Sequence, residues 1–375
     1  MIYLDNAATT KPCEAAVNAA LNAFSNFGNP SSLHKMGLDA EKIIKSSAKS
    51  ISGLIGCNKN NIVFTSGGTE SNNTAIFGTA RLARNKHAVT TKIEHPSVLE
   101  PFRVLENEGW EIDYVNVDSN CRIDLSDLRS KLMKDTALVS VMHVNNETGT
   151  IQPIEKIREI IDEICPGAVF HVDAVQSAGK IDINAEKRKI DLLSLSGHKI
   201  NGIKGCGALY INKRTEPLIV GGGQQENKRS GTENVPGIAA FGAAAEYHMN
   251  NNGYDRIKEL RKSLLNGLLS EISDTRYNGC ATDYSPYVLN VSFLGIKSEI
   301  LLHSLEAKGI FVSSGSACSS NKPMPSHVLS AMGCTNAEIT SAIRFSFDSF
   351  TDADDINGIV TVIKEEVEKI RKYMR

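Results

Sequence analysis

The chain has 375 residues, of which 41% are hydrophobic and 22% are charged, and its formal net charge is -2. This length predicts about two domains with a sizeable core, and the near-neutral charge gives no reason to expect nucleic acid or an anionic membrane as a partner. No apolar run approaches the roughly 18 residues of a membrane span, and no secretory signal is visible, so we expect a cytoplasmic protein.

Strand-like and helical segments alternate along the first half of the chain. Ile62–Thr65 is typical of a buried strand, and it gives way at Gly67 to a helix start at residues 69–76. Such alternation favours a largely parallel sheet with helices on both faces. Further strands are expected at residues 114–117, 137–141, 168–170 and 190–195.

The turn after the first of these strands has the composition of a phosphate-binding loop. Ser66-Gly67-Gly68-Thr69-Glu70 offers backbone N–H groups and hydroxyls at a helix N-terminus, where anions are stabilised. An isolated turn of this kind is more often an ordinary helix cap. Evidence elsewhere in the sequence for a site that binds a phosphate-bearing cofactor would favour the phosphate interpretation.

Two polar residues follow the next strands. His95 lies between a strand-like run and a helix start, where an imidazole can stack on a planar ring and transfer protons near neutral pH. The alternative is an ordinary hydrogen-bonded loop histidine. Asn146 closes a later strand and can contact a ring substituent.

A lysine and an aspartate at two strand ends form the strongest chemical signal. The run 168–170 is followed by Asp173, and the run 190–195 by Ser196-Gly197-His198-Lys199. Neighbouring strand ends of one sheet can converge on one crevice. Pyridoxal phosphate needs such a pair, an amine to form a Schiff base and a carboxylate to keep the pyridine nitrogen protonated. Gln176, Ser196 and His198 can add polar contacts to the same cofactor.

The next stretches are less specific. Gly221-Gly222-Gly223 and Arg229-Ser230-Gly231-Thr232 offer donors for an anion, or form only a surface loop. The polar stretch 249–253 is either a domain boundary or a loop within one long helix. Beyond it, the pattern changes to a mixed α and β character.

One of the eight cysteines stands apart. No two cysteines form a C-x-x-C pair, which argues against a structural zinc site or an internally ligated cluster, and most are expected to be buried thiols. Cys318 lies in a long run of small and polar residues, 313–323, which predicts an exposed loop. The alternative is an incidental surface thiol.

The last segments predict a strand and a packing helix. Alternation places Ile343, Phe345 and Phe347 on one face, so that Arg344 points to the other. A guanidinium there can bind a substrate carboxylate or form a structural salt bridge. From Thr351 onward, apolar residues recur at helical spacing.

Together these segments resemble the cysteine desulfurases of the NifS/IscS type over nearly the whole chain. By this resemblance the fold is α/β, that of type I pyridoxal phosphate enzymes (aspartate aminotransferase-like). It has a mostly parallel seven-stranded sheet in a large domain, residues 14–250. A smaller α+β domain, residues 1–13 and 251–375, carries the cysteine loop. The resemblance is carried by Tyr3–Thr10, Gly28–Ser32, Phe64–Ser71, His143–Glu147, His171–Ala174, Ser196–Lys199, Arg229–Thr232, Ser313–Cys318 and Ile343–Ser346.

The resemblance also implies residue roles. Lys199 would form the Schiff base, Asp173 would contact the pyridine nitrogen, and His95 would stack on the ring and transfer protons. Arg344 would bind the substrate carboxylate, and Cys318 would accept sulfur. The other cofactor contacts would come from Gly68, Thr69, Asn146, Gln176, Ser196 and His198, and from Thr232 of the partner subunit in a homodimer.

The implied reaction converts L-cysteine to L-alanine and leaves the sulfur on Cys318 as a persulfide. The sulfur would pass to an acceptor protein for iron–sulfur cluster assembly, tRNA thiolation or another route. A selenocysteine lyase or another class V pyridoxal phosphate enzyme would also keep Lys199 and Asp173, and remains the alternative. A non-enzymatic sulfur carrier would need only the Cys318 loop.

The chain departs from the family pattern in two places. The family usually has an aromatic residue and a proline after the Schiff-base lysine, whereas residues 201–205 here are Asn-Gly-Ile-Lys-Gly, so the turn geometry is expected to differ. The chain also ends soon after its last helix. The tail by which housekeeping members bind a scaffold protein is therefore not expected, and the sulfur acceptor stays open.

Overall fold

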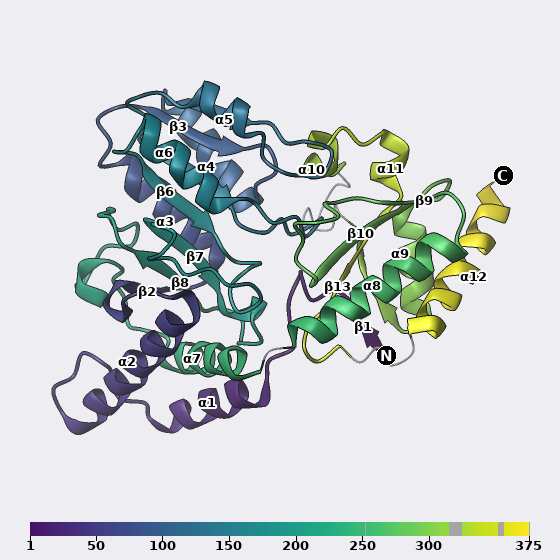
Figure 1. The fold of residues 1–375 in the computed structure, drawn as a ribbon. Coiled ribbons are helices and arrows are strands. Elements are labelled where there is room, and N and C mark those ends of the chain that lie inside the picture. Colours follow the sequence, from purple (N-terminus) through teal and green to yellow (C-terminus); the bar gives the residue numbers. More distant parts are fainter. Residues whose placement is uncertain (252, 315–324, 352–355, 375) are drawn as a thin grey trace.

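The computed structural model describes residues 1–251, 253–314, 325–351 and 356–374. Within these residues the chain forms a seven-stranded sheet, a four-stranded sheet and one pair of short strands. Figure 1 shows the two larger sheets side by side, each with its own helices. One edge of the large sheet faces the smaller sheet.

The large sheet is mostly parallel, as predicted. Its strand order is β2-β8-β7-β6-β5-β3-β4, in which β8 runs antiparallel to β2 and β7 while the other neighbours run parallel. The carboxyl ends of β2, β3, β5, β6 and β7 therefore lie at one edge. The strands span Ile62–Thr65 (β2), His87–Thr91 (β3), Glu111–Val115 (β4), Leu138–Met142 (β5), Val169–Asp173 (β6), Leu192–Ser196 (β7) and Gly207–Ile211 (β8).

Helices cover both faces of this sheet. Side chains of α3 and α4 pack with Val169 and Leu192, whereas those of α2, α5, α6 and α7 share a core with Phe170 and Leu193. Because successive strand residues point to opposite faces, a strand between two helical layers is buried throughout, as β6 is. These helices span Gly68–Ala80 (α3), Pro96–Asn107 (α4), Lys35–Ile55 (α2), Leu125–Lys131 (α5), Ile154–Ile164 (α6) and Val235–Asn250 (α7), and α1 (Glu14–Ser25) packs on α7.

The smaller sheet is antiparallel and has its own core. Its strand order is β12-β13-β10-β9, and α8, α9 and α12 supply apolar side chains to one face. The strands are β9 (Thr275–Tyr277), β10 (Val288–Phe293), β12 (Ser313–Ser314) and β13 (Ala342–Ser346), and β1 (Ile2–Tyr3) pairs with β11 (Ile310–Phe311). The helices are α8 (Tyr254–Glu271), α9 (Ser298–Ala307), α10 (His327–Ala331), α11 (Asn336–Thr340) and α12 (Ile356–Met374).

The alternation expected around Arg344 is present in the structure. Ile343, Phe345 and Phe347 are buried in the core of the smaller sheet. Arg344 projects from the opposite face of β13, toward the large sheet. The polar stretch after residue 249 separates α7 from α8. The domain division at residues 13/14 and 250/251 stays a prediction.

In the part of the chain that the structure describes, no helix combines the length and the apolar character needed to cross a bilayer.

Candidate active site

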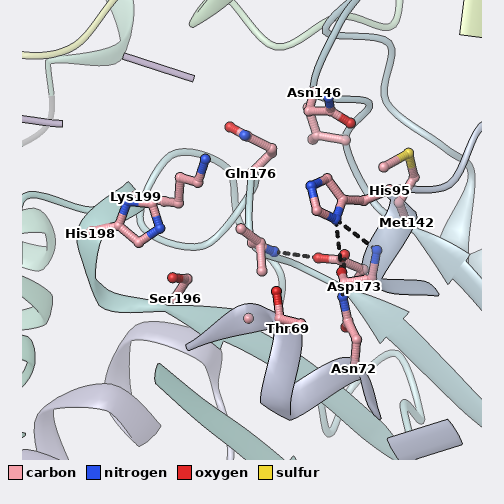
Figure 2. Close-up of a pocket in the computed structure, with 14 residues that line it drawn as sticks. Thr69, Asn72, His95, Met142, Asn146, Asp173, Gln176, Ser196, His198 and Lys199 are labelled. Carbon is pink, nitrogen blue, oxygen red and sulfur yellow. Dashed lines mark hydrogen bonds between the residues drawn. The ribbon is translucent and has the colours of Figure 1, made fainter. Parts of the chain in front are cut away.

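A cavity of about 140 Å³ lies at the edge of the large sheet where β2, β5, β6 and β7 end. Segments that leave the carboxyl ends of parallel strands converge at such an edge. Of the predicted site residues that the structure describes, all except Thr232 and Arg344 line this cavity. The lining consists of Gly68, Thr69, Asn72, His95, Ser97, Met142, Val144, Asn146, Asp173, Val175, Gln176, Ser196, His198 and Lys199 (Figure 2).

One corner of the cavity suits a phosphate group. Gly68 opens α3, and a Cβ at this position would lie only 2.8 Å from Val175 Cγ2. The first N–H groups of a helix have no partner within it, and the helix dipole favours an anion beside them. Ser196 Oγ is buried and has no hydrogen-bond partner among the described residues. The corner therefore offers unused donors to an anion.

His198 lies at the same end of the cavity. Its Nδ1 is 3.2 Å from the hydroxyl of Thr9. Burial, and then the charge of nearby Lys199, lower the pKa of His198 to about 4. The imidazole is therefore neutral at pH 7 and can donate one hydrogen bond.

Asp173 is fixed in the floor of the cavity. Its Oδ1 accepts the backbone N–H of Val175 at 2.9 Å, and its Oδ2 accepts Nδ2 of Asn72 at 2.8 Å. These two bonds hold the carboxylate in one orientation at the end of β6. A fixed, buried carboxylate suits a protonated ring nitrogen.

His95 caps the N-terminus of α4. Its Nδ1 accepts the backbone N–H of Ser97 at 3.1 Å and lies 2.8 Å from the hydroxyl of the same residue. Since a backbone N–H only donates, the neutral ring carries its proton on Nε2. Burial lowers the pKa of His95, while the charge of Asp173 acts in the opposite direction. The structure thus presents a neutral imidazole with one N–H beside the cavity.

The N-terminal segment closes the side of the cavity that holds Lys199. Nζ of Lys199 donates to the backbone oxygens of Ala7 at 2.6 Å and Ala8 at 2.8 Å. Nε2 of Gln176 also donates to the oxygen of Ala7, at 3.0 Å, which leaves Gln176 Oε1 buried without a hydrogen-bond partner among the described residues. Gln176 therefore retains an unused acceptor in the cavity wall.

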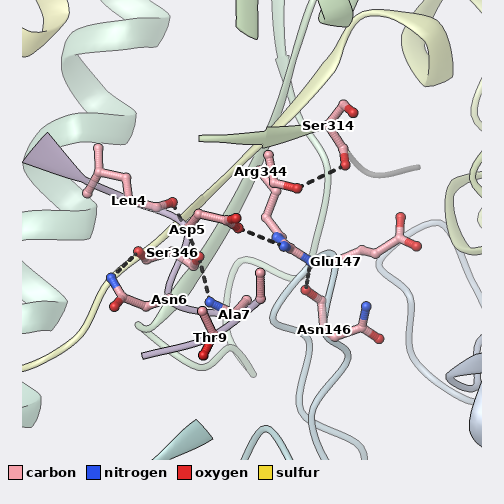
Figure 3. A network of polar contacts seen from close by, with 12 residues as sticks. Leu4, Asp5, Asn6, Ala7, Thr9, Asn146, Glu147, Ser314, Arg344 and Ser346 are labelled. Carbon is pink, nitrogen blue, oxygen red and sulfur yellow. Dashed lines mark hydrogen bonds and ion pairs between the residues drawn. The ribbon is translucent and has the colours of Figure 1, made fainter. Parts of the chain in front are cut away.

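Arg344 lies next to the cavity rather than in its lining. Its Nη1 donates to the backbone oxygen of Asn146 at 3.1 Å, and its Nη2 pairs with Asp5 Oδ1 at 3.0 Å (Figure 3). The guanidinium is buried, and Nε has no hydrogen-bond partner in the described chain. A guanidinium carries five N–H donors in total, so Arg344 can also donate to a further carboxylate.

Thr232 is not brought to this cavity. Thr232 is exposed and lines a separate hollow with Gln225 and Arg229. Arg229 pairs there with Glu70, its Nε 2.9 Å from Oε1. The resemblance had placed Thr232 in the site of a partner subunit, and one chain does not test that prediction. Cys318 lies outside the described residues.

Sequence reasoning missed several residues of the site, among them Asn72, Ser97 and Asp5, whose side chains contact predicted residues. Asn72 lies four residues after Gly68, a spacing that places both on one side of α3, so a local signal existed. Ser97 lies two residues after the capping His95, where a side-chain contact to the cap is common. Asp5 lies 339 residues from Arg344, and no local pattern connects them.

These residues fit one kind of ligand. The cavity combines an amine, a fixed carboxylate, a helix N-terminus and unused polar atoms of Ser196, Gln176 and Asn72. This donor set suits a planar molecule with a phosphate, a basic ring nitrogen and a carbon that reacts with amines.

Comparisons with known proteins agree with this geometry. Residues 2–359 match the family model described as aminotransferase class-V. A cysteine desulfurase of Nostoc sp. is 43% identical over 99% of this chain and 94% of its own length. A cysteine desulfurase IscS of Dictyoglomus turgidum is also 43% identical, over 99% of this chain and 95% of its own length.

Solved structures share the fold over both sheets. A NifS-like protein has a TM-score of 0.92 at 34% identity and covers 98% of this chain and 99% of its own. A structure described as SspA in complex with cysteine has a TM-score of 0.82 at 32% identity, with coverage of 94% and 100%.

Proposed function

We propose that this chain, which belongs to the class V aminotransferase family, is a pyridoxal phosphate-dependent cysteine desulfurase. It converts L-cysteine to L-alanine and retains the sulfur for delivery. The observation that carries the proposal is the convergence of Lys199, Asp173 and the N-terminus of α3 on one cavity. The curated relatives, both cysteine desulfurases, support this function over a selenocysteine lyase or another class V enzyme.

Several residues of the cavity would hold the cofactor. When bound, pyridoxal phosphate supplies an aldehyde that joins amines and a ring that accepts the electron pair of the broken Cα–H bond. The N–H groups of Gly68 and Thr69, with Ser196 and His198, would hold the phosphate. The carboxylate of Asp173 would keep a proton on the ring nitrogen.

Three side chains act on the substrate in this proposal. Nζ of Lys199 would hold the cofactor through its aldehyde, and as a free amine it would take the proton from Cα of the substrate. His95, neutral with its proton on Nε2, stacks on the ring and donates a proton during turnover. Arg344 binds the substrate carboxylate.

The sulfur passes to a thiol of the protein. We assign this role to Cys318, which lies outside the described residues. Its thiolate attacks the sulfur of the substrate, the Cβ–S bond breaks, and a protein persulfide and L-alanine result. The overall balance is L-cysteine and one thiol in, L-alanine and one persulfide out.

A second copy of the chain is the partner that the exposed surface suggests. Leu21, Phe24, Phe27 and Leu33, on α1 and the segment after it, are 58%, 66%, 81% and 93% exposed. Burying these four side chains against a second copy would remove them from water. We therefore propose a cytoplasmic homodimer, in which Thr232 reaches the partner's cavity. We also propose a sulfur-acceptor protein as a partner, which is either an iron–sulfur scaffold or a thiolation enzyme.

Mass spectrometry of the intact protein after brief exposure to L-cysteine tests the function. We expect one added sulfur, located on Cys318. In Cys318→Ser, sulfide release should be lost while the absorbance of the bound cofactor persists. Cys57→Ser is the matched control, because burial raises the pKa of the Cys57 thiol to about 12 and keeps it protonated.

Two results would contradict the proposal. A protein that binds no pyridoxal phosphate would remove the function altogether. Added sulfur on another cysteine would keep the reaction but remove the role of Cys318.

A further inference from the structure

A buried hydrogen-bond network joins the turn after Lys199 to the strand that carries Arg344. Its centre is Asn201, which stands where the family usually has an aromatic residue. Asn201 is 1% exposed and has a φ of 62°, a left-handed conformation that asparagine and glycine tolerate best. The residue that departs from the family pattern, Asn201, is therefore buried in the interior of the protein.

The side chain of Asn201 has partners on three separate segments. Its Nδ2 donates to the backbone oxygen of Lys11 at 2.8 Å and to Asp348 Oδ2 at 2.6 Å. Its Oδ1 lies 2.9 Å from His248 Nε2, on α7. The backbone N–H of Asn201 donates to the hydroxyl of Thr10 at 2.8 Å. The turn after Lys199 is thus tied to the N-terminal segment and to the chain just beyond β13.

Asp348 is the partner from the smaller sheet. It follows β13, four residues after Arg344, and is 3% exposed. Its second oxygen, Oδ1, accepts the backbone N–H of Phe350 at 2.5 Å. A buried carboxylate is costly unless it is hydrogen-bonded or paired with a cation. Burial lowers the pKa of neighbouring Lys180 to about 8, and the charge of Asp348 acts against that shift, so a buried cation lies near this carboxylate.

The Asn201–Asp348 bridge spans the two elements that would bind opposite ends of the substrate. Lys199 is two residues from Asn201 and, in the proposed function, acts at the end of the substrate that carries the amine. Arg344 is four residues from Asp348 and belongs to the carboxylate end. A change in the spacing of two such groups by about 1 Å can cost on the order of a hundredfold in rate.

We propose that Asn201 and Asp348 are positioning residues that set the spacing between Lys199 and Arg344. The bridge thereby selects substrates that carry a carboxylate on the amine-bearing carbon. This inference rests on the proposed function, because it assumes that an amine and a carboxylate of one ligand reach Lys199 and Arg344.

The test compares two ligands that differ only in the carboxylate. L-Alanine, the product, has it, and ethylamine is the same molecule without it. Asn201→Gly removes the bridge and keeps the left-handed backbone accessible. We expect the Kd of L-alanine, read from the absorbance of the bound cofactor, to rise about tenfold or more, and that of ethylamine to change less than about twofold. Asn184→Gly, at another left-handed asparagine with φ 41° outside the cavity lining, is the matched control and should change neither.

A second variant keeps the proposal testable if Asn201→Gly fails to fold. Asp348→Ala removes the carboxylate that accepts from Asn201, and it should show the same preference for loss with L-alanine. Combining Asn201→Gly with Asp348→Ala should cost no more than the worse single change, because both break one interaction.

Each remaining result decides the question. Equal losses for the two ligands, or no loss for either, would overturn the role of the bridge and leave the proposed function standing. A wild-type protein whose bound cofactor does not respond to L-alanine would overturn the function and the inference together.

Discussion

The two sheets contribute to the cavity in different ways. The large sheet supplies Asp173, whose partners Asn72 and Val175 belong to the same layered unit. The smaller sheet supplies Arg344, whose partner Asn146 follows β5 of the large sheet, while its other partner, Asp5, bridges to Ser346 of β13. Groups held within one packed unit are preorganised, whereas a group held across units depends on how the units meet. The proposed cofactor half of the site is thus held within one packed unit, and the proposed substrate half is set by a contact between the two units.

Removing the amine of Lys199, in the large-sheet half of the site, should have the largest effect on turnover. We expect Lys199→Ala to lower the formation of L-alanine by about a thousandfold or more, because both the covalent link and the proton acceptor at Cα are lost. Lys204→Ala, an exposed lysine in the same loop, is the matched control and should keep normal turnover. Borohydride reduction should trap cofactor on the wild-type chain and not on Lys199→Ala. Wild-type rates in Lys199→Ala would remove the residue from the reaction.

Breaking the substrate half should change binding more than chemistry. We expect Arg344→Ala to raise the KM for L-cysteine about 30-fold to 150-fold, since a charge-assisted carboxylate contact contributes about 2–3 kcal/mol. Steady-state kinetics measures the effect. Arg276→Ala is the matched control, because Arg276 lies on β9 of the same sheet, pairs with Glu338 of α11 and does not line the cavity. An unchanged KM would place the substrate carboxylate elsewhere.

Acid should weaken the large-sheet half through its buried histidines. Burial lowers the pKa of His171, inside β6, to about 3 from its ordinary value of 6.5. The stability that this neutral ring contributes is complete above pH 6.5 and is lost as pH falls toward 3, because only the unfolded chain takes up the proton.

We therefore expect the unfolding free energy in urea to fall with acidification between about pH 6 and pH 4, and His171→Asn to make that fall shallower by about 1.4 kcal/mol per pH unit. The variant also loses ring contacts to Ser140 and Ser194, so the slope and not the absolute value is the measurement. Equal slopes for the two proteins would contradict the assignment.

The smallest effect is expected at a residue that only orients another. Asn72→Ala removes one of the two hydrogen bonds to Asp173, which should weaken cofactor binding about fivefold. Asn73→Ala is the matched control, since its amide donates to the backbone of Thr69 instead. A cofactor titration with each apoprotein measures the difference. Equal affinities in the two variants would show that the second bond suffices.

Local patterns account for much of the large sheet. The apolar run Ile62–Thr65 predicts a strand, and β2 has the same bounds. Alternation around Arg344 predicts which face of β13 it occupies, and the burial of Ile343 and Phe345 confirms it. Other strand predictions are displaced by a few residues. The strand predicted at 114–117 overlaps only the end of β4, which spans Glu111–Val115. Strand ends shift because cross-strand pairing, which a single segment does not encode, decides where a strand stops.

The candidate site divides in the same manner. Two segments stand out in the sequence, the glycine turn at Gly68 and the segment that ends in Lys199. In each, the residues with functional groups are neighbours along the chain. The pairing of Arg344 with Asp5 has no such signature, and neither has the bridge from Asn201 to Asp348, 147 residues apart.

By itself, the sequence determined the alternation of strands and helices, the family, and the short segments that carry the amine, the aspartate and the phosphate corner. Only the tertiary structure decided what holds Asp173 in place, what pairs with Arg344, and what occupies the turn after Lys199. The physical reason is range. Backbone periodicity and turn chemistry act over a few residues, whereas the partner of a buried polar group is whichever group the complete packing brings within hydrogen-bond distance.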